Sequence, residues 1–281
     1  MDLSLFENQI FFTTVRIVVQ QKTGVGSSVG TGFLVKSSIP RHQGHSAILL
    51  VSNKHVFLDP NQPVEMRFHA RDKANPDKPD LKKSVNFKHS NLLGRYAEHP
   101  NPMVDIACSN VSFINAPKHG VYWRTLPIEM CATFEEPQLT AAKDVWFVGY
   151  PENRFDVAHN LPILRVGHIA SVPTIDFNNE PQFLIDAQVF PGSSGSPVFV
   201  TLGTNYSFLG VVSRVMIKDE QIQTIDTAGV STVQQVLGLG IVFKATQVRE
   251  LVDIVVEQIA KKLDQKKPEP TIDPNAGGNA H

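Results

Sequence analysis

The sequence has little of what would assign it to a specialised class of protein. It contains only two cysteines in 281 residues, Cys108 and Cys131. They cannot form a disulfide framework, so we expect free buried thiols in a reducing compartment. The net charge of −1 gives no reason to expect nucleic acid or an anionic membrane as a partner. No apolar run is long enough to span a bilayer.

The N-terminus has no features of a targeting segment. It begins Met1-Asp2-Leu3-Ser4, without a basic segment or an apolar run of the kind found in signal peptides. We therefore expect a cytoplasmic protein. The apolar fraction of 42% and charged fraction of 19% are ordinary for a globular chain, which at this length can form one large domain or two small ones.

Short β-branched and apolar runs, separated by turn residues, dominate the first 245 residues. This pattern, with little helical periodicity, favours an all-β barrel architecture. The stretch 216–236 interrupts it and is either a long hairpin or a regulatory loop, with the hairpin favoured. The expected strands are 13–20, 30–35, 47–52, 64–68, 84–87, 104–111, 144–149, 161–172, 182–190, 198–200, 207–215 and 237–244.

The C-terminal segment shows helical periodicity instead. Its apolar residues are Val248, Leu251, Val252, Val255, Ile259 and Leu263. Their spacing predicts a helix of about five turns packed on the barrel, with Thr246 as its cap and lysines near its end. Residues 266–281 have too little apolar content to fold and are predicted to be a disordered tail.

A stretch of small residues, Pro191-Gly192-Ser193-Ser194-Gly195-Ser196-Pro197, lies between two strand-like runs. A tight loop of this composition can bring several backbone N–H groups toward one point, beside a serine at its apex. That arrangement suits acyl transfer, in which a hydroxyl attacks a carbonyl and amides hold the oxyanion. An ordinary Gly/Ser hairpin is the alternative.

A histidine and a carboxylate occur in matching contexts. His55 directly follows the most apolar strand of the first half, where a general base would be held rigidly. Asp105 lies between apolar neighbours and could offset its burial by accepting the ring N–H of a histidine. The alternatives are a half-buried structural histidine and a loop-capping aspartate, and Asp186 is a competing carboxylate. His42 and His45 form an H-x-x-H pair that is weak as a metal site.

Taken together, these blocks resemble those of the trypsin-like (chymotrypsin-fold) serine proteases, and most of all the bacterial HtrA-type branch without its PDZ domain. The order histidine, aspartate, serine makes the set specific. The matching blocks are Gly30-Thr31-Gly32-Phe33-Leu34-Val35, Val51-Ser52-Asn53-Lys54-His55-Val56, Val104-Asp105-Ile106-Ala107, Val148-Gly149-Tyr150-Pro151, Val166-Gly167-His168-Ile169, Gly192–Pro197 and Leu239-Gly240-Ile241-Val242-Phe243.

The resemblance implies two six-stranded antiparallel barrels followed by the helix. The implied domain covers residues 13–265, after a lead-in at 1–12. Its first barrel spans about 13–125, its second about 140–245, and the helix 246–264.

The resemblance also implies a catalytic triad of Ser194, His55 and Asp105. The backbone N–H groups of Gly192 and Ser194 would form the oxyanion hole, with Ser193 between them. Ser193 stands where zymogen-activated members carry an aspartate, so activation by N-terminal cleavage is not expected. Control would act by ordering loops or through a regulatory protein partner. No cofactor and no metal are implied.

Specificity is less determined by the sequence. Spacing from Ser194 implies a substrate pocket formed by Gln188, Val189, Phe190, Val212, Ser213 and Arg214. No acidic residue stands at its base, which disfavours Lys or Arg substrates and favours a small or medium apolar side chain. Arg214 or Lys244 would favour an acidic side chain if either pointed inward.

The function predicted from the sequence is hydrolysis of a protein or peptide substrate by a serine endopeptidase. The alternatives are a protease-fold scaffold with a collapsed oxyanion hole and, more weakly, an esterase-like hydrolase.

Overall fold

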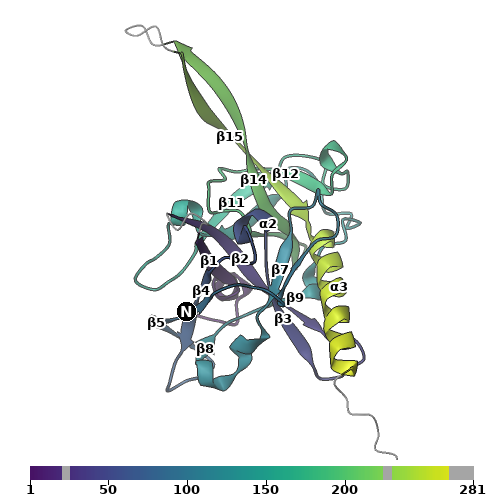
Figure 1. Ribbon diagram of the computed structural model, residues 1–281. Coiled ribbons are helices and arrows are strands. Elements are labelled where there is room, and N and C mark those ends of the chain that lie inside the picture. The colour runs from purple at the N-terminus through teal and green to yellow at the C-terminus, as the bar shows by residue number, and fades with distance from the viewer. Residues whose placement is uncertain (21–25, 224–229, 266–281) are drawn as a thin grey trace, which may run out of the picture.

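The structure, a computed structural model, describes residues 1–20, 26–223 and 230–265, and for 218–223 and 230–236 the backbone alone. The chain forms two β-structures with a long helix, α3 (Ala245–Asp264), packed along one side (Figure 1). The predicted tail at 266–281 lies outside the described residues.

The first half forms a nine-stranded sheet with the order β5-β4-β1-β2-β3-β7-β6, to which β8 and β9 add at β4 and β2. The sheet is antiparallel except for the short β2–β9 pair. Six strands were expected here, and β6, β8 and β9 lie outside the expected strand ranges. The strands are β1 Thr14–Gln20, β2 Ser27–Ser38, β3 Ser46–Ser52, β4 Val64–Arg71, β5 Pro79–His89, β6 Tyr96–Glu98, β7 Ala107–Asn110, β8 Val121–Tyr122 and β9 Leu126–Pro127.

The second half is a closed six-stranded antiparallel barrel with the order β10-β11-β12-β15-β14-β13. Two of its strands continue beyond the barrel as a long hairpin that projects from the body of the molecule (Figure 1). The favoured interpretation of the stretch 216–236 as a hairpin is therefore confirmed for residues 216–223 and 230–236, while residues 224–229 lie outside the described part of the chain. The strands are β10 Asp144–Gly149, β11 Ile163–Ile169, β12 Gln182–Asp186, β13 Pro197–Leu202, β14 Asn205–Gln223 and β15 Val230–Lys244.

Short helical segments connect these strands. They are α1 Phe6–Gln9, α2 Lys54–Phe57, and the 3₁₀ turns Ile10–Phe12, Ser112–Asn115, Pro117–His119, Ile128–Met130, Pro151–Asn153 and Phe177–Asn179. The all-β class, the closed barrel and the C-terminal helix confirm the predicted fold class.

Three strands are shorter than their sequence patterns predict. The expected strand 104–111 is paired only from Ala107 to Asn110, so Asp105 lies in the loop before it. The expected strands 161–172 and 182–190 are limited to Ile163–Ile169 and Gln182–Asp186. Apolar residues in flanking loops are buried by tertiary packing, and sequence periodicity alone cannot distinguish them from strand residues.

The two halves and α3 share one hydrophobic core. It contains Phe33 and Leu49 of the first sheet, Phe147 of the barrel, and Val248 and Leu251 of the helix. The helix follows directly on β15, and its cap is Lys244 rather than the expected Thr246, with no side-chain capping bond. The chain changes from extended to helical at Ala245, which places Thr246 inside the first turn.

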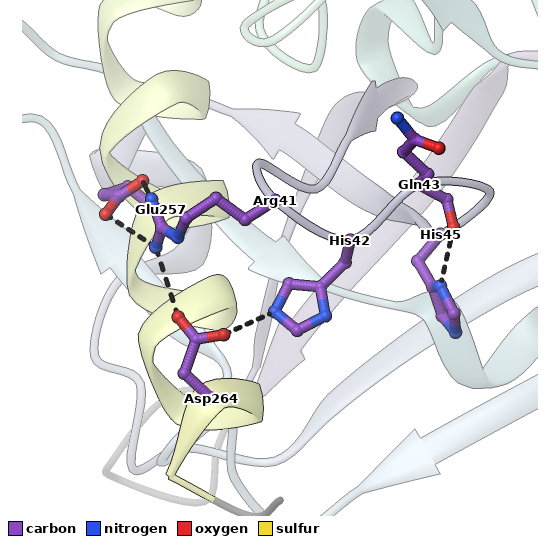
Figure 2. A network of polar contacts seen from close by, with 6 residues as sticks. All are labelled: Arg41, His42, Gln43, His45, Glu257 and Asp264. Carbon is purple, nitrogen blue, oxygen red and sulfur yellow. Dashed lines mark hydrogen bonds and ion pairs between the residues drawn. The ribbon is translucent and has the colours of Figure 1, made fainter.

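The β2–β3 turn is tied to the end of α3 by a polar network (Figure 2). Arg41 donates to both carboxylate oxygens of Glu257 at 3.0 and 3.1 Å, and to Asp264 at 3.4 Å. His42 Nε2 lies 3.0 Å from Asp264, whereas His45 Nδ1 lies 3.2 Å from the carbonyl of Gln43. The histidines of the H-x-x-H pair therefore have different partners, and no His/Cys/Asp/Glu group in the described residues is arranged to hold a metal.

Both cysteines are free and buried, as predicted, and burial raises the pKa of each thiol to about 12. Because thiolates are the reactive form, neither is suited to act as a nucleophile at neutral pH. Within the described ranges, no helix combines the length and hydropathy needed to cross a membrane.

Replacing Leu251 by Ala tests whether α3 stabilises the whole domain. Leu251 is 1% exposed in the shared core. We expect its truncation to lower the free energy of unfolding by about 2–5 kcal/mol, measured by urea denaturation. Ile254→Ala, at a helix position that is 36% exposed, is the control and should cost much less. Equal effects would contradict the shared core.

Candidate active site

Thr31 of β2 holds the Gly/Ser loop of the barrel against the first sheet. Its N–H donates to the carbonyl of Ser194 at 2.9 Å, and its hydroxyl donates to the carbonyl of Gly192 at 2.8 Å. The same hydroxyl accepts the N–H of Tyr150 at 3.1 Å, and the Thr31 carbonyl accepts Ser52 Oγ at 2.5 Å. Thr31 is completely buried, so these bonds fix the loop between the two halves.

His55 and Asp105 are brought together by the loop before β7. His55 Nδ1 lies 2.6 Å from Asp105 Oδ2, and the His55 N–H donates to Asp105 Oδ1 at 3.2 Å. Asn53, which is buried, donates its side-chain amide to the Asp105 carbonyl at 2.7 Å. Lys54 donates to the carbonyls of His99 and Asn101 at 3.1 and 3.2 Å. Three consecutive residues thus attach the histidine segment to the aspartate loop.

Asp105 is kept ionised by its hydrogen bonds. Its burial alone would raise the carboxyl pKa, but the bonds from His55 and from the Ser213 hydroxyl outweigh that effect and lower the pKa below its ordinary value of 3.8. Ser213 Oγ lies 2.8 Å from Asp105 Oδ2. An ionised carboxylate can only accept, so His55 Nδ1 carries a proton, and Nε2 is the ring nitrogen that can accept one.

The Ser194 hydroxyl is turned toward the barrel. Its Oγ donates to the carbonyl of Ser213 at 2.9 Å. In the part of the chain that the structure describes, no hydrogen bond joins Ser194 Oγ to the His55 ring. Because a serine side chain moves by rotation about one bond, the Ser194 hydroxyl can leave this acceptor without a backbone change.

The loop leaves two of its backbone amide groups without a backbone acceptor in the described structure. The N–H of Glu152 donates to the carbonyl of Pro191 at 2.5 Å. In a trans peptide the N–H points opposite to the C=O, so the N–H of Gly192 is directed away from Glu152. Among the described residues, the N–H groups of Gly192 and Ser194 have no backbone acceptor. Both amides are therefore free to bind an anion.

Two features of the loop require glycine at position 192. Its φ is +89°, in the left-handed region, and a Cβ there would overlap the carbonyl oxygen of Tyr150. The adjacent Ser193 is 1% exposed, and its hydroxyl has no hydrogen-bond partner in the described structure. An aspartate at that position would therefore be buried without the cation that it needs.

The residues expected to form the substrate pocket differ in how exposed they are. Gln188 and Arg214 are exposed, and Phe190 is half-buried with the guanidinium of Arg165 4.9 Å from its ring centroid. Val189 and Val212 belong to the barrel core, at 3% and 0% exposure.

The structure also locates two other residues for which sequence reasoning had offered a role. Lys244 is 5% exposed and paired with Asp176 at 2.6 Å, which excludes it from binding an acidic substrate. Asp186, the competing carboxylate, is exposed on β12, where its register partner on β11 is His168.

A cavity of about 470 Å³ opens directly beside His55. Its walls are formed by Lys54, His55, Pro102, Met103, Asp105 and Arg214. Of the predicted pocket residues only Arg214 contributes to it. Sequence reasoning did not identify this cavity, because Pro102 and Met103 belong to a loop with no motif.

Three contributions to the site were missed from the sequence. Ser213 was predicted as a pocket wall but donates to Asp105, and Thr31 was noted only as part of a glycine-rich strand. Glu152 holds the Pro191 carbonyl through its N–H, and its φ is +48°. A glutamate in the sequence gives no indication of such a left-handed backbone conformation. The two glycines beside Thr31 were the available signal, since they allow close approach of another backbone.

The profile of the trypsin-like peptidase domain matches residues 30–205, more than half of the chain. The protein belongs to the trypsin-like peptidase family. The family prediction is thus confirmed, and a protease function is supported. No curated protein sequence matches the chain significantly.

Solved structures resemble this protease at low identity. One is the active form of the Rv3671c protease from M. tuberculosis, with a TM-score of 0.50 and 19% identity over 88% of this chain and 82% of that one. The serine endoprotease of Yersinia pestis has a TM-score of 0.48 and 12% identity, over 91% and 67%. A scabies mite inactivated protease paralogue has 0.49 and 11%, over 89% and 96%.

Gly192→Ala tests the geometry of the amide pair in this protease. The added methyl must displace the Tyr150 carbonyl, so we expect the loop to shift and peptide hydrolysis to fall by about 10²-fold or more, since one oxyanion donor contributes that much. Gly203→Ala is the matched control, because Gly203 also has a positive φ, +63°, but has open space around it. Its activity should be retained, and equal losses would contradict the clash.

Asp105→Asn tests whether the pKa of the Asp105 carboxyl is lowered in the folded protein. Because the folded-state pKa of Asp105 is depressed, its contribution to stability is complete above the unfolded-state pKa of about 4 and is lost as pH falls through the folded value. The difference in unfolding free energy between wild type and variant should therefore be constant above about pH 5 and shrink below pH 4. Asp144→Asn, at a side chain 90% exposed, should show little difference throughout. A pH-independent Asp105 effect would contradict this assignment.

Proposed function

We propose that this protein is a serine endopeptidase that acts through Ser194, His55 and Asp105. The observation that carries the proposal is the 2.6 Å contact between His55 Nδ1 and an ionised Asp105. It leaves His55 Nε2 as the base, beside a serine loop that Thr31 fixes in place. A structural histidine would not need a half-buried carboxylate that is held by a second donor, Ser213.

The reaction begins when Ser194 rotates from the Ser213 carbonyl toward His55. His55 Nε2 takes the hydroxyl proton while Ser194 Oγ forms a bond to the carbonyl carbon of the scissile peptide. The carbonyl becomes an oxyanion, which the N–H groups of Gly192 and Ser194 stabilise. Collapse of this intermediate breaks the C–N bond, and His55 transfers its proton to the leaving amine.

The second half of the reaction releases the acyl group. Water donates a proton to His55 Nε2 and attacks the ester carbon, which forms a second oxyanion in the same hole. Its collapse returns the proton to Ser194 Oγ and frees the new carboxyl terminus. Asp105 remains ionised throughout and stabilises the His55 imidazolium in both halves.

In our proposal, the oxyanion hole of this protease is oriented without a new N-terminus. Ser193 cannot form the ion pair by which an aspartate captures a freed amine, and the Glu152 N–H instead fixes the Pro191 carbonyl. We propose protein or peptide substrates, and control by loop ordering or by a regulatory protein partner. The projecting β14–β15 hairpin continues the strand that carries Ser213 and Arg214, and we propose it as the element through which a partner acts.

One observation favours a second candidate, a protease-fold binding module that is catalytically latent. Ser194 Oγ is bonded to the Ser213 carbonyl and not to His55 in the described structure. If that bond persisted when a peptide is bound, the serine would not be activated. The two candidates differ in whether Ser194 reacts with an electrophile.

Labelling with a fluorophosphonate tests the proposal. We expect a covalent adduct on Ser194, identified by mass spectrometry, and hydrolysis of a peptide library. Ser194→Ala should remove the adduct and lower hydrolysis by about 10⁴-fold or more. Ser38→Ala, at an exposed serine of β2, is the control and should behave as wild type. Hydrolysis that survives Ser194→Ala would contradict the mechanism, and absence of any adduct would favour the latent module.

A further inference from the structure

The cavity beside His55 is separate from the loop that would hold the attacked carbonyl. Its lining includes His55 and Asp105 but no residue between Gln188 and Ser194. A group bound in it would therefore touch the histidine side of the site. At about 470 Å³ it has room for more than one side chain. Its chemistry is thus relevant to substrate residues other than the one whose carbonyl is attacked.

Two cations line this cavity. Arg214 is exposed and forms no ion pair with any carboxylate among the described side chains. Lys54 uses its ammonium to donate to two backbone carbonyls, those of His99 and Asn101, so no carboxylate neutralises its charge. The one acid of the wall, Asp105, is ionised and directs its carboxylate toward His55 and Ser213. With two cations against one anion, the cavity offers net positive charge to an incoming group.

The remaining wall is apolar. Pro102 is exposed, and Met103 exposes 58% of its surface although it is a large hydrophobic residue. Such a wall can cover the methylenes of an acidic side chain while a guanidinium binds its carboxylate. Arg has the planar fork that suits bidentate carboxylate recognition, whereas Lys54 is already committed to holding the 99–101 segment.

Arg214 is also placed to meet an extended substrate. It follows Ser213, whose carbonyl faces Ser194 Oγ, and it lies at an irregular part of β14, with register shifts on both sides. A substrate chain that passes Ser194 along this strand brings a neighbouring side chain to the cavity. Binding a main chain along a strand while pockets select its side chains is a common mode of peptide recognition.

We propose that this cavity is a subsite that selects an aspartate or glutamate side chain of the substrate, at a position near the scissile bond but different from the attacked residue, with Arg214 as its specificity-determining residue. The inference rests on the proposed endopeptidase function for its catalytic consequence. It differs from an acidic preference at the attacked residue itself, for which Lys244 is excluded by its pairing with Asp176.

The test compares peptides that carry Asp, Asn or Lys at each position from four residues before to three residues after the cleaved bond. At one position, kcat/KM should be about 10- to 100-fold higher for Asp than for Asn, the range expected for one charge-assisted hydrogen bond, and lowest for Lys. Arg214→Gln should abolish the Asp/Asn ratio, because kcat/KM falls much further for the Asp peptide than for the Asn peptide. Arg214→Glu should reverse the preference toward Lys.

Arg71→Gln is the matched control. Arg71 is an exposed arginine at the end of β4, so its replacement removes one positive charge without touching the cavity. The control should keep the wild-type Asp/Asn ratio. An Asp preference that survives Arg214→Gln, or a wild-type enzyme that cleaves Asp and Asn peptides equally at every position, would overturn the subsite.

A binding measurement separates this inference from the proposed function. Ser194→Ala protein is titrated calorimetrically with acetylated, amidated peptide pools that fix Asp, Asn or Lys at one position. Tighter binding of one Asp pool, lost in Ser194→Ala combined with Arg214→Gln, supports the subsite even if wild type forms no fluorophosphonate adduct. Equal binding of the Asp and Lys pools, with normal Ser194 labelling, overturns the subsite alone.

Discussion

The bonds from Thr31 to the loop of Ser194 are the constraint on which the site depends. Thr31 is a buried residue of the first sheet that forms hydrogen bonds through its N–H, carbonyl and hydroxyl groups. Its N–H donates to the carbonyl of Ser194, and its hydroxyl donates to the carbonyl of Gly192. Those carbonyls belong to the peptides whose N–H groups come from Ser193 and Gly195, and these N–H groups donate to the carbonyls of Phe190 and Val212. The loop of Ser194 is therefore held between the barrel and the half of the molecule that carries His55 and Asp105.

Because the Thr31 bonds join the two halves, the site also depends on α3 and the shared core, which keep those halves together. The helix contacts strands of both halves, and its buried residues belong to the same cluster as those of the sheet and the barrel. The halves cannot separate without exposing that cluster, so the Thr31 bonds persist as long as the core does. The polar network between the β2–β3 turn and the end of α3 is largely exposed, with Arg41 51% accessible, and adds little free energy.

How far the site could be predicted differs from residue to residue. His55 and Asp105 were recognised from their places next to apolar runs, and the structure places them 2.6 Å apart. Ser213 was assigned to a pocket wall because its hydroxyl looks the same in sequence whether it faces a substrate or a carboxylate. The cavity with Met103 and Arg214 joins segments about a hundred residues apart, and nothing in either segment indicates the other.

The sequence alone determined the β-rich class, the closing helix, the family and the types of residue at the three chemical positions, because these depend on local periodicity and on short motifs. Strand limits near Asp105, the glycine at φ +89°, the tether from Glu152 to Pro191 and the direction of the Ser194 hydroxyl were decided only by the tertiary structure. Each depends on a partner far along the chain, and the geometry of a buried hydrogen bond exists only once both partners have been brought into contact.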